Sequence, residues 1–289
     1  IYADYYYIEA LMRWKKIRAG QSLSEANKFM HPGILHTKES LERMKYYIEH
    51  RIEPAYSSYR LLEADSCALS TYQMQGPFEV IARLGVNKHT KRPSEDDHKA
   101  AYLNALMWTL TGDEAHARKS IEILNAYSAM LKLIGPNDND DPLCASLQGS
   151  MLANAAELIK HTYSKVTPAE IAGWEKMLRT VFIPVLDTFF KAKPYTNGNW
   201  GAAATKAYMA FGIFLEDEAL YNQAVHFYYN GHDNGTIKNY IGENGQCQES
   251  GRDQDHVMFG LGNLAEACET AYNQGDEKLS LIHISEPTR

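Results

Sequence analysis

Residues 100–131, AAYLNALMWTLTGDEAHARKSIEILNAYSAML, contain two helical patterns joined by a short turn. Apolar residues recur at three- to four-residue steps on both sides of the turn, which predicts two helices, each with one buried face. These apolar residues are Ala101, Ala105, Trp108 and Leu110 before the turn, and Ala117, Ile121, Leu124 and Leu131 after it. Gly112 suits the left-handed position that closes the first helix, and Asp113 suits the N-cap of the second. The stretch therefore predicts a tight αα-hairpin.

Similar helical patterns fill much of the remaining chain. Thr167 and Glu170 form a capping box, with Pro168 at the first helical position, so a helix is expected to begin there. Further helices are predicted in three places: around residues 151–159, after Pro194, and over residues 257–271. Repeated helix pairs with short turns indicate an all-α array of αα-hairpins. Periodicity alone leaves open whether this array closes into a ring.

A few segments depart from this regular pattern. Thr37 or Ser40 is expected to cap a helix that runs towards Arg60, with a kink at Pro54. Residues 61–94 show few periodic signals and are expected to be largely irregular. The remaining expectations are a helix over residues 1–19, short joints at residues 216–217 and 274–276, and a short strand at residues 235–240.

The composition is typical of a folded globular protein. Of the 289 residues, 45% are hydrophobic and 22% charged, so disorder is not expected, and the chain is long enough for one large domain or two ordinary ones. The net charge of −7 argues against a nucleic acid or an anionic membrane as partner. No apolar run approaches the roughly 18 residues that span a bilayer. The four cysteines form no CxxC or Cys/His cluster, which disfavours a zinc site of the usual spacing and leaves both buried thiols and disulfides open.

Residues 242–262, GENGQCQESGRDQDHVMFGLG, gather polar side chains in a glycine-punctuated loop that an apolar helical run follows at once. The polar side chains are Glu243, Gln246, Gln248, Glu249, Ser250, Arg252, Asp253, Gln254, Asp255 and His256. Acid–base and hydrogen-bonding groups placed at the start of a helix are typical of a functional site. This loop is therefore the first candidate for one.

The two ends of the sequence predict a fragment. The chain begins at Ile1 without a signal segment, so an earlier start is expected. Residues 279–289, LSLIHISEPTR, break the helical pattern and resemble a translated sequencing adapter. We therefore expect one truncated domain over residues 1–278 and a non-native tail over residues 279–289. A gene whose end does not match the adapter would contradict this hypothesis.

Six stretches carry a resemblance to a known family. They are HPGILHT (31–37), AAYLNALMWTLTGD (100–113), IEILNAYSAML (121–131), PLCASLQGSMLANAAELIK (142–160), NGNW (197–200) and CQESGRDQDHVMFGLGNLAEACETAYNQGD (247–276). Together they resemble the alginate lyase superfamily of polysaccharide lyases over about residues 31–278. The resemblance implies an (α/α) toroid, here an incomplete ring of antiparallel helix hairpins. It also implies a periplasmic or secreted enzyme that cleaves alginate or a related polyuronate by β-elimination, with neither a metal nor an organic cofactor.

β-Elimination needs a group that neutralises the uronate carboxylate, a base that removes H5, and an acid that protonates O4. The resemblance implies that Asn199 binds the carboxylate, assisted by the helix dipole. Relatives that read Asn-Asn-His at this point have a histidine that this chain lacks, which leaves His256 as the best base. Arg252 would bind a carboxylate in a bidentate manner. The resemblance implies that a tyrosine is the acid. Tyr240 and Tyr195 are the tyrosines nearest the proposed site, but neither matches a known motif, and in relatives the tyrosine can come later in the chain.

The sequence gives weaker support for the predicted substrate contacts and orienting groups. Trp200, Tyr240 and Tyr72 could offer faces to sugar rings, Gln148 could line the cleft, and Glu249 with Asp253 could orient Arg252 and His256. Each assignment has a structural alternative. Asn197 or Asn199 could be an N-cap, His256 could be paired with Asp253, Arg252 could pair with Glu249 or Asp255, and the aromatic residues and Gln148 could be packing residues.

Two other functions compete with the lyase. A glycoside hydrolase on the same architecture would use a pair of carboxylic acids, for which Glu243, Glu249, Asp253 and Asp255 are available. A glycan-binding protein without activity would explain the absent histidine and the unassigned tyrosine. In each case the expected partner is a polysaccharide, anionic for the lyase, and not a nucleic acid.

Overall fold

The computed structural model describes residues 29–136, 140–191, 198–232 and 234–276, and its fold is all-α as expected. The expected helix over residues 1–19 and the tail at 279–289 lie outside these residues. The helices are α2 (Lys38–Glu49), α3 (Ala55–Ala64), α4 (Lys91–Thr111), α5 (Glu114–Met130), α6 (Asp141–Thr162), α7 (Pro168–Met177), α8 (Ile183–Lys191), α9 (Gly198–Phe214), α10 (Glu218–Asn230), α11 (Ile237–Tyr240) and α12 (Gln254–Asn273). Three short turns of helix complete them: η1 (Ser66–Ala68), η2 (Gly85–Thr90) and the π-helical η3 (Leu178–Phe182).

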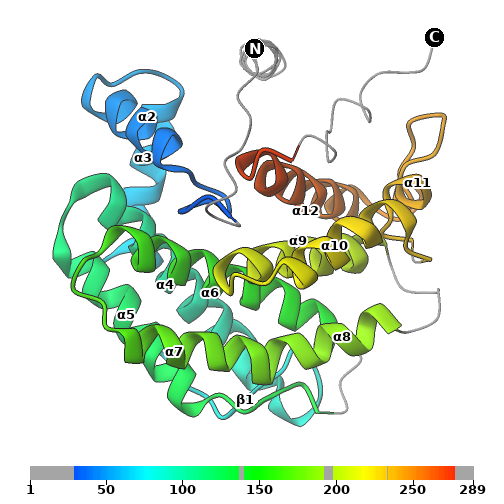
Figure 1. Ribbon diagram of the computed structural model, residues 1–289, viewed down its shortest axis with the longest axis horizontal. Helices are drawn as coiled ribbons and strands as arrows, with labels where there is room; N and C mark the ends of the chain where they lie inside the picture. The colour runs from blue at the N-terminus through cyan, green and yellow to red at the C-terminus, as the bar shows by residue number, and fades with distance from the viewer. Residues whose placement is uncertain (1–28, 137–139, 192–197, 233, 277–289) are drawn as a thin grey trace.

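The long helices form a curved two-layer array of antiparallel pairs (Figure 1). In one layer α4 packs on α6, α6 on α9, and α9 on α12. In the other layer α5 packs on α4 and α7, α8 packs on α6, and α10 packs on α9. This arrangement is the (α/α) toroid that the resemblance implied. The strands β1 (Val80–Ile81) and β2 (Leu133–Ile134) form a two-residue parallel pair beside it.

The αα-hairpin predicted from residues 100–131 is confirmed. Gly112 ends α4 with a left-handed φ of 73°, and Asp113 caps α5 by accepting a hydrogen bond from the Ala115 N–H at 2.9 Å. The first helix begins at Lys91, within the stretch of residues 61–94 that was expected to be largely irregular. Local turn chemistry was therefore sufficient to locate this joint.

Two predicted helix caps are confirmed, and one predicted helix is wrong. The capping box of Thr167 and Glu170 is present, and Thr37 caps α2. The predicted continuous helix from Thr37 towards Arg60 is wrong, because α2 ends at Glu49 and α3 begins after Pro54. Arg51 has a left-handed φ of 51°, and Pro54 lacks an N–H and disfavours helical backbone at Glu53, so two separate helices form instead of one kinked helix.

The predicted strand at residues 235–240 is also wrong. Thr236 is instead the N-cap of the short helix α11, and its carbonyl accepts hydrogen bonds from the N–H groups of Asn239 and Tyr240 at 3.0 and 2.8 Å. The stretch contains β-branched and aromatic residues, which suit a strand, but such preferences are weak against the tertiary context. Tyr240 is fully buried there.

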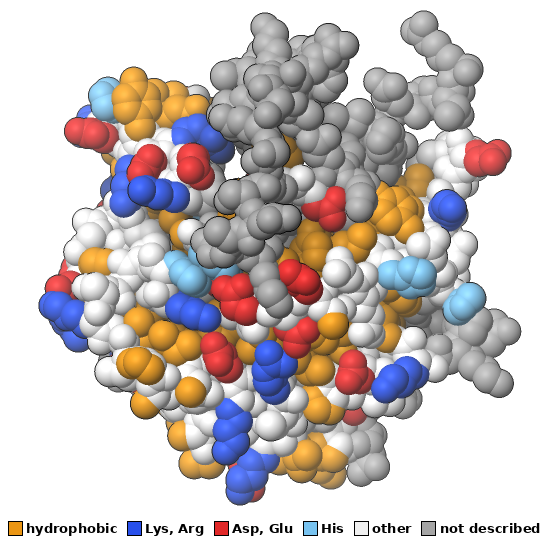
Figure 2. Space-filling model, in the orientation of Figure 1, with side chains coloured by type: hydrophobic (Ala, Val, Ile, Leu, Met, Phe, Trp, Pro, Cys, Tyr) orange, Lys and Arg blue, Asp and Glu red, His pale blue; other side chains and the backbone are white. Residues whose placement is uncertain are grey.

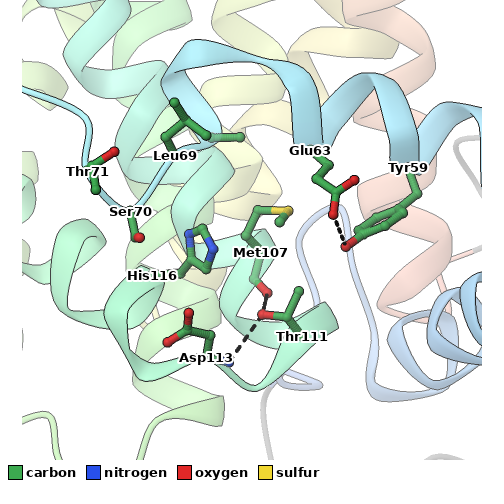
Figure 3. A pocket seen from close by; sticks show the side chains of 10 residues that line it. Tyr59, Glu63, Leu69, Ser70, Thr71, Met107, Thr111, Asp113 and His116 are labelled. Atoms are coloured by element: carbon green, nitrogen blue, oxygen red, sulfur yellow. Dashed lines mark hydrogen bonds between the residues drawn. The ribbon is translucent and has the colours of Figure 1, made fainter.

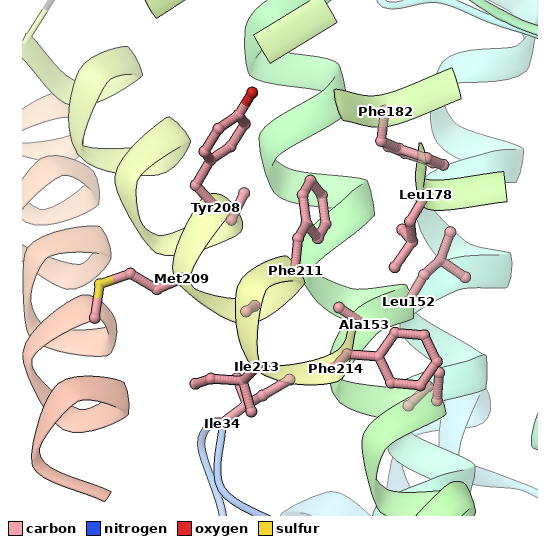
Figure 4. Packing of buried hydrophobic residues seen from close by; sticks show 14 of the residues in the cluster. Ile34, Leu152, Ala153, Leu178, Phe182, Tyr208, Met209, Phe211, Ile213 and Phe214 are labelled. Carbon is pink, nitrogen blue, oxygen red and sulfur yellow. The ribbon is translucent and has the colours of Figure 1, made fainter. Parts of the chain in front are cut away.

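The core lies between the two layers and is made of aromatic and aliphatic side chains (Figure 4). Phe211 of α9 and Phe182 of η3 meet over Gly149 of α6, where a Cβ atom would lie 2.5 Å from Phe211. Gly149 therefore permits the close approach of α6 and α9. All four cysteines are free thiols, and Cys67, Cys144 and Cys268 are buried. Among the described residues, no helix is both long and apolar enough to cross a bilayer.

Candidate functional site

The polar loop predicted as a site, residues 242–262, runs from the end of α11 into the first turns of α12 and contacts the start of α9. Ile241 and Cys247 form an antiparallel bridge, and Gly245 has a left-handed φ of 78° at the turn between them. The side-chain Oε1 of Gln248 accepts a hydrogen bond from the Gly198 N–H at 2.8 Å. Two stretches singled out separately in the sequence, residues 197–200 and 242–262, thus meet in the fold.

Asp253 and His256 form a pair at the beginning of α12. Asp253 is the N-cap, and its Oδ1 accepts the backbone N–H of His256 at 2.8 Å. Both carboxylate oxygens also lie 2.7 Å from Nδ1 of His256. These hydrogen bonds hold the pKa of Asp253 below its usual value. A proton on Nδ1 leaves the lone pair of Nε2 as the basic site of a half-exposed ring.

Arg252 lies next to this pair and is held only loosely. Its Nη1 is 3.7 Å from Oε2 of Glu249, and its Nε is 3.8 Å from Oδ2 of Asp253. Both separations exceed hydrogen-bonding distance. The Arg252 side chain is 47% exposed while that of Glu249 is 3% exposed, so Glu249 lies beneath it. The guanidinium keeps its donors available for an anionic group.

Several other cations on the described surface have closer acidic partners. Figure 2 shows basic and acidic side chains interspersed over the described part of one face. Arg83 Nη1 lies 2.8 Å from Glu95, Lys165 Nζ lies 2.6 Å from Glu114, and Lys206 Nζ lies 2.8 Å from Glu266. Compared with these pairs, Arg252 is weakly neutralised.

The start of α9 holds two of the predicted residues. Asn199 is 1% exposed, and its side-chain oxygen has no hydrogen-bond partner in the described part of the chain. Trp200 is partly buried and packs against the core. Asn197 lies outside the described residues. Asn199 thus follows the glycine that contacts the loop, but its own side chain is covered.

Tyr240, the predicted proton donor, lies in the interior. It is fully buried, its ring packs where a Cβ atom on Gly198 would meet it at 2.5 Å, and its hydroxyl lies against Gly260. The nearby Cys247 thiol is a weak partner, and no described nitrogen or oxygen bonds the hydroxyl. Burial raises the pKa of this phenol. The hydroxyl oxygen itself is buried in this structure.

Tyr72 and Gln148, the two remaining predicted contacts, belong to a second polar group around α4. The Tyr72 hydroxyl donates to Oδ1 of Asp97 at 2.9 Å, and the Tyr127 hydroxyl donates to Oδ2 at 2.7 Å. The backbone N–H groups of Gln75 and Gly76 also donate to this carboxylate. Asp97 is fully buried and therefore anchors the irregular segment before β1 onto α4.

His98 follows Asp97 and is equally buried. Its ring packs edge-on against Tyr127, with 4.3 Å between ring centroids, and it contacts the side chain of Gln148. Burial lowers the pKa of His98 to about 3, so it is neutral at physiological pH. Sequence reasoning missed both Asp97 and His98. The signal was available, since Asp96-Asp97-His98 precedes a strongly apolar helical pattern in which buried polar residues need partners.

A third polar group joins the segment before α2 to the first layer of helices. His36 Nε2 lies 2.7 Å from the Tyr102 hydroxyl, and Glu266 of α12, paired with Lys206 of α9, acts electrostatically on Tyr102. Burial lowers the pKa of His36 to about 4 and raises that of Tyr102. Nothing in the sequence associates these residues, because they come from four separate segments.

A pocket of about 380 Å³ lies elsewhere, at the joint between α4 and α5 (Figure 3). Side chains of α3, α4 and α5 line it, including Tyr59, Glu63, Met107 and His116. Its lining includes none of the residues predicted as catalytic or substrate-binding. The pocket is therefore separate from the polar loop.

Comparisons with known proteins support the toroid fold and identify the family of the chain. The chain aligns with alginate lyase A1-III from Sphingomonas species A1 with a TM-score of 0.61 and 14% identity, covering 82% of this chain and 70% of that one. A tyrosine-to-phenylalanine variant of alginate lyase A1-III, solved with a tetrasaccharide, aligns with a TM-score of 0.60 and 15% identity, covering 82% and 69%. No curated protein matches the chain. The family model for alginate lyase matches residues 73–287, well over half of the sequence. The chain therefore belongs to the alginate lyase family and is a lyase that acts on polysaccharides.

Proposed function

We propose that this lyase cleaves alginate or a related polyuronate by β-elimination, with His256 as the base that removes H5. The observation that carries the proposal is the Asp253–His256 pair beside the loosely held Arg252 at the start of α12. Asp253 orients the imidazole through Nδ1, so that Nε2 faces the reaction as an acceptor. The tetrasaccharide bound to a variant of alginate lyase A1-III supports a polysaccharide as the substrate class.

Arg252 neutralises the uronate carboxylate in this proposal. Removal of H5 places negative charge on the carboxylate, and a cation there lowers the barrier most as that charge develops. The planar guanidinium can donate two parallel hydrogen bonds to a carboxylate. Asn199 would supply a further hydrogen bond and the positive end of α9 an additional field. Because Asn199 is covered, this contact requires the substrate to displace the groups above it.

His256 also returns the proton to O4, because the buried Tyr240 is not positioned to do so. One side chain can serve as base and then as acid only if H5 and O4 lie on the same face of the sugar ring. They do so in mannuronate and glucuronate, and they lie on opposite faces in guluronate. The proposal therefore specifies a preference for mannuronate or glucuronate over guluronate. By family resemblance, the enzyme would act in the periplasm or outside the cell.

An ultraviolet assay tests both the reaction and the preference. The purified protein is incubated separately with polymannuronate, polyguluronate and polyglucuronate. Elimination creates a conjugated C4–C5 double bond that absorbs at about 232 nm. We expect this absorbance to rise with polymannuronate or polyglucuronate and much less with polyguluronate. New reducing ends without the absorbance would indicate a hydrolase and overturn the proposal, and a preference for polyguluronate would overturn the shared role of His256.

Two matched histidine substitutions test the base. His256→Gln is expected to lower kcat by on the order of 10²-fold or more, because it removes the proton acceptor. His226→Gln, on the exposed face of α10, is the control and should leave kcat unchanged. Equal activity of the two variants would exclude His256 as the base.

A further inference from the structure

A cluster of two histidines and a glutamate lies at the C-terminal end of α6. It contains His31 from the segment before α2, with Glu157 and His161 from the last turns of α6. We propose that these three side chains bind a divalent zinc ion that fastens the segment before α2 to the toroid. This site does not depend on the proposed function, since none of its residues belongs to the polar loop.

The three side chains converge on one point. Each offers a ligand atom, and these atoms all lie within 4.8 Å of one another. His31 Nδ1 is 2.7 Å from Oε1 of Glu157, and His161 Nε2 is 3.5 Å from Oε2 of the same carboxylate. A tetrahedral zinc ion with bonds of about 2.0–2.2 Å requires ligand atoms roughly 3.3–3.5 Å apart. Because the rings of His31 and His161 are stacked, they would have to tilt towards a common point for both nitrogens to ligate the ion in the plane of their rings.

Neighbouring groups already orient the ligands. The Gly33 N–H donates to Oε1 of Glu157 at 3.1 Å. Nε2 of His31, on the far side of its ring, lies 2.6 Å from Oε1 of Glu216, which follows α9. A histidine that binds a metal through one ring nitrogen commonly presents the other to a carboxylate, which fixes the tautomer and makes the ligand more basic. Glu216 thus plays the supporting role that such sites require.

The charges around the cluster also favour a cation. Glu157 is 1% exposed, and its Oε2 has no hydrogen-bond partner among the described residues, which is costly for a buried carboxylate. The rings of His31 and His161 stack with centroids 4.2 Å apart, so charging both would place two positive rings face to face. The C-terminal ends of α6 and α9 meet here, since Lys160 Nζ donates to the Phe214 carbonyl at 3.3 Å. Helix C-termini attract positive charge, and the Lys160 ammonium already supplies part of it.

The kinds of ligand atom in the cluster indicate which metal ion it would bind. Two imidazole nitrogens and one carboxylate oxygen suit zinc and neighbouring first-row metals better than calcium or magnesium, which prefer oxygen. Three protein ligands leave a fourth position for water. In this arrangement the ion would join residues 31 and 157, which are far apart in the sequence, and so brace the chain before α2 against the end of α6.

Metal binding to the whole chain is the direct test. The protein, prepared without a histidine tag and stripped with a chelator, is titrated with Zn²⁺ by calorimetry and with Co²⁺ by visible absorption. We expect one Zn²⁺ per chain, a higher Tm with Zn²⁺, and the intense visible bands of tetrahedral Co²⁺. Absence of stoichiometric binding together with an unchanged Tm would overturn the proposal, whatever the lyase assay shows.

Three variants locate the ion. His161→Gln should abolish the Zn²⁺-dependent rise in Tm, and Glu216→Gln should weaken Zn²⁺ binding by roughly 10–100-fold, the effect usual for a supporting carboxylate. His226→Gln, an exposed histidine on α10, should bind Zn²⁺ as the wild type does. Loss of binding only in His226→Gln, or binding unchanged in both His161→Gln and Glu216→Gln, would place the ion elsewhere and refute the assignment. If His161→Gln does not fold, the Co²⁺ spectrum of the wild type and the Glu216→Gln affinity still decide.

Discussion

At the scale of single residues, Asp253 combines two roles that substitution can separate. It caps α12 and holds the imidazole of His256. Asn is as good an N-cap as Asp but has no charge to stabilise an imidazolium. We expect Asp253→Asn to keep Tm close to the wild-type value and to lower kcat by on the order of 10²-fold. Asp253→Ala should lose kcat similarly and should also lower the Tm, because the cap is lost. An Asp253→Asn variant with wild-type kcat would show that Asp253 serves only as a cap.

The buried hydroxyl of Tyr240 gives a second prediction at this scale. The hydroxyl has no oxygen or nitrogen partner among the described residues, so its removal should cost little stability. We expect Tyr240→Phe to retain kcat and to unfold at or slightly above the wild-type Tm. Tyr240→Ala removes the whole ring and should destabilise the fold by about 3–5 kcal/mol. A folded Tyr240→Phe variant without lyase activity would instead restore Tyr240 as the proton donor.

At the scale of elements, structure that depends on residues close in the sequence was predictable, and structure that depends on distant contacts was not. The α4–α5 joint and the start of α7 depend on residues within one turn of each other, such as Gly112 and Asp113. The helix α11 was missed because its conformation is set by packing around Tyr240 and not by its own residue preferences.

In the candidate site, too, only the contacts between residues close in the sequence were predictable. His256 and Asp253 are three residues apart in one turn of helix, and the sequence alone suggested their pairing. The contact between Gly198 and Gln248 joins residues 50 positions apart, and the one between His31 and Glu157 joins residues 126 positions apart. Without a second sequence, nothing in the chain indicates such distant pairs except the resemblance to a family.

Two glycines of α12 test how this helix packs on α11. Gly260 faces the Tyr240 hydroxyl, where a Cβ atom would overlap it, whereas Gly262 is exposed with no heavy atom within 4 Å of a Cβ. We expect Gly260→Ala to lower the free energy of unfolding by about 1–3 kcal/mol through overpacking. The control Gly262→Ala should raise it by up to about 1 kcal/mol, because alanine is the better helix former. Chemical denaturation measures both, and equal effects would contradict the close contact of α11 with α12.

At the scale of the whole molecule, the buried neutral histidine of α4 predicts how stability depends on pH. Burial lowers the pKa of His98 to about 3, whereas an unfolded chain titrates histidine at about 6.5. As the pH falls below 6.5, the unfolded chain binds a proton that the folded chain does not bind until near pH 3. The resulting stability is complete above pH 6.5 and is lost progressively between these two values.

As the pH is lowered, this loss of stability begins before most carboxylates take up protons. It can therefore be measured separately from theirs. Each such group contributes a slope of up to about 1.4 kcal/mol per pH unit, and His36, with its pKa lowered to about 4, adds to it. Denaturant unfolding at several pH values between 7.5 and 5 should therefore show falling stability in the wild type. The slope should be shallower in His98→Gln, which retains a polar side chain towards Gln148, and unchanged in the exposed control His226→Gln. The same slope in all three proteins would mean that His98 takes up its proton in the folded state, and that the polar group around α4 is open to water.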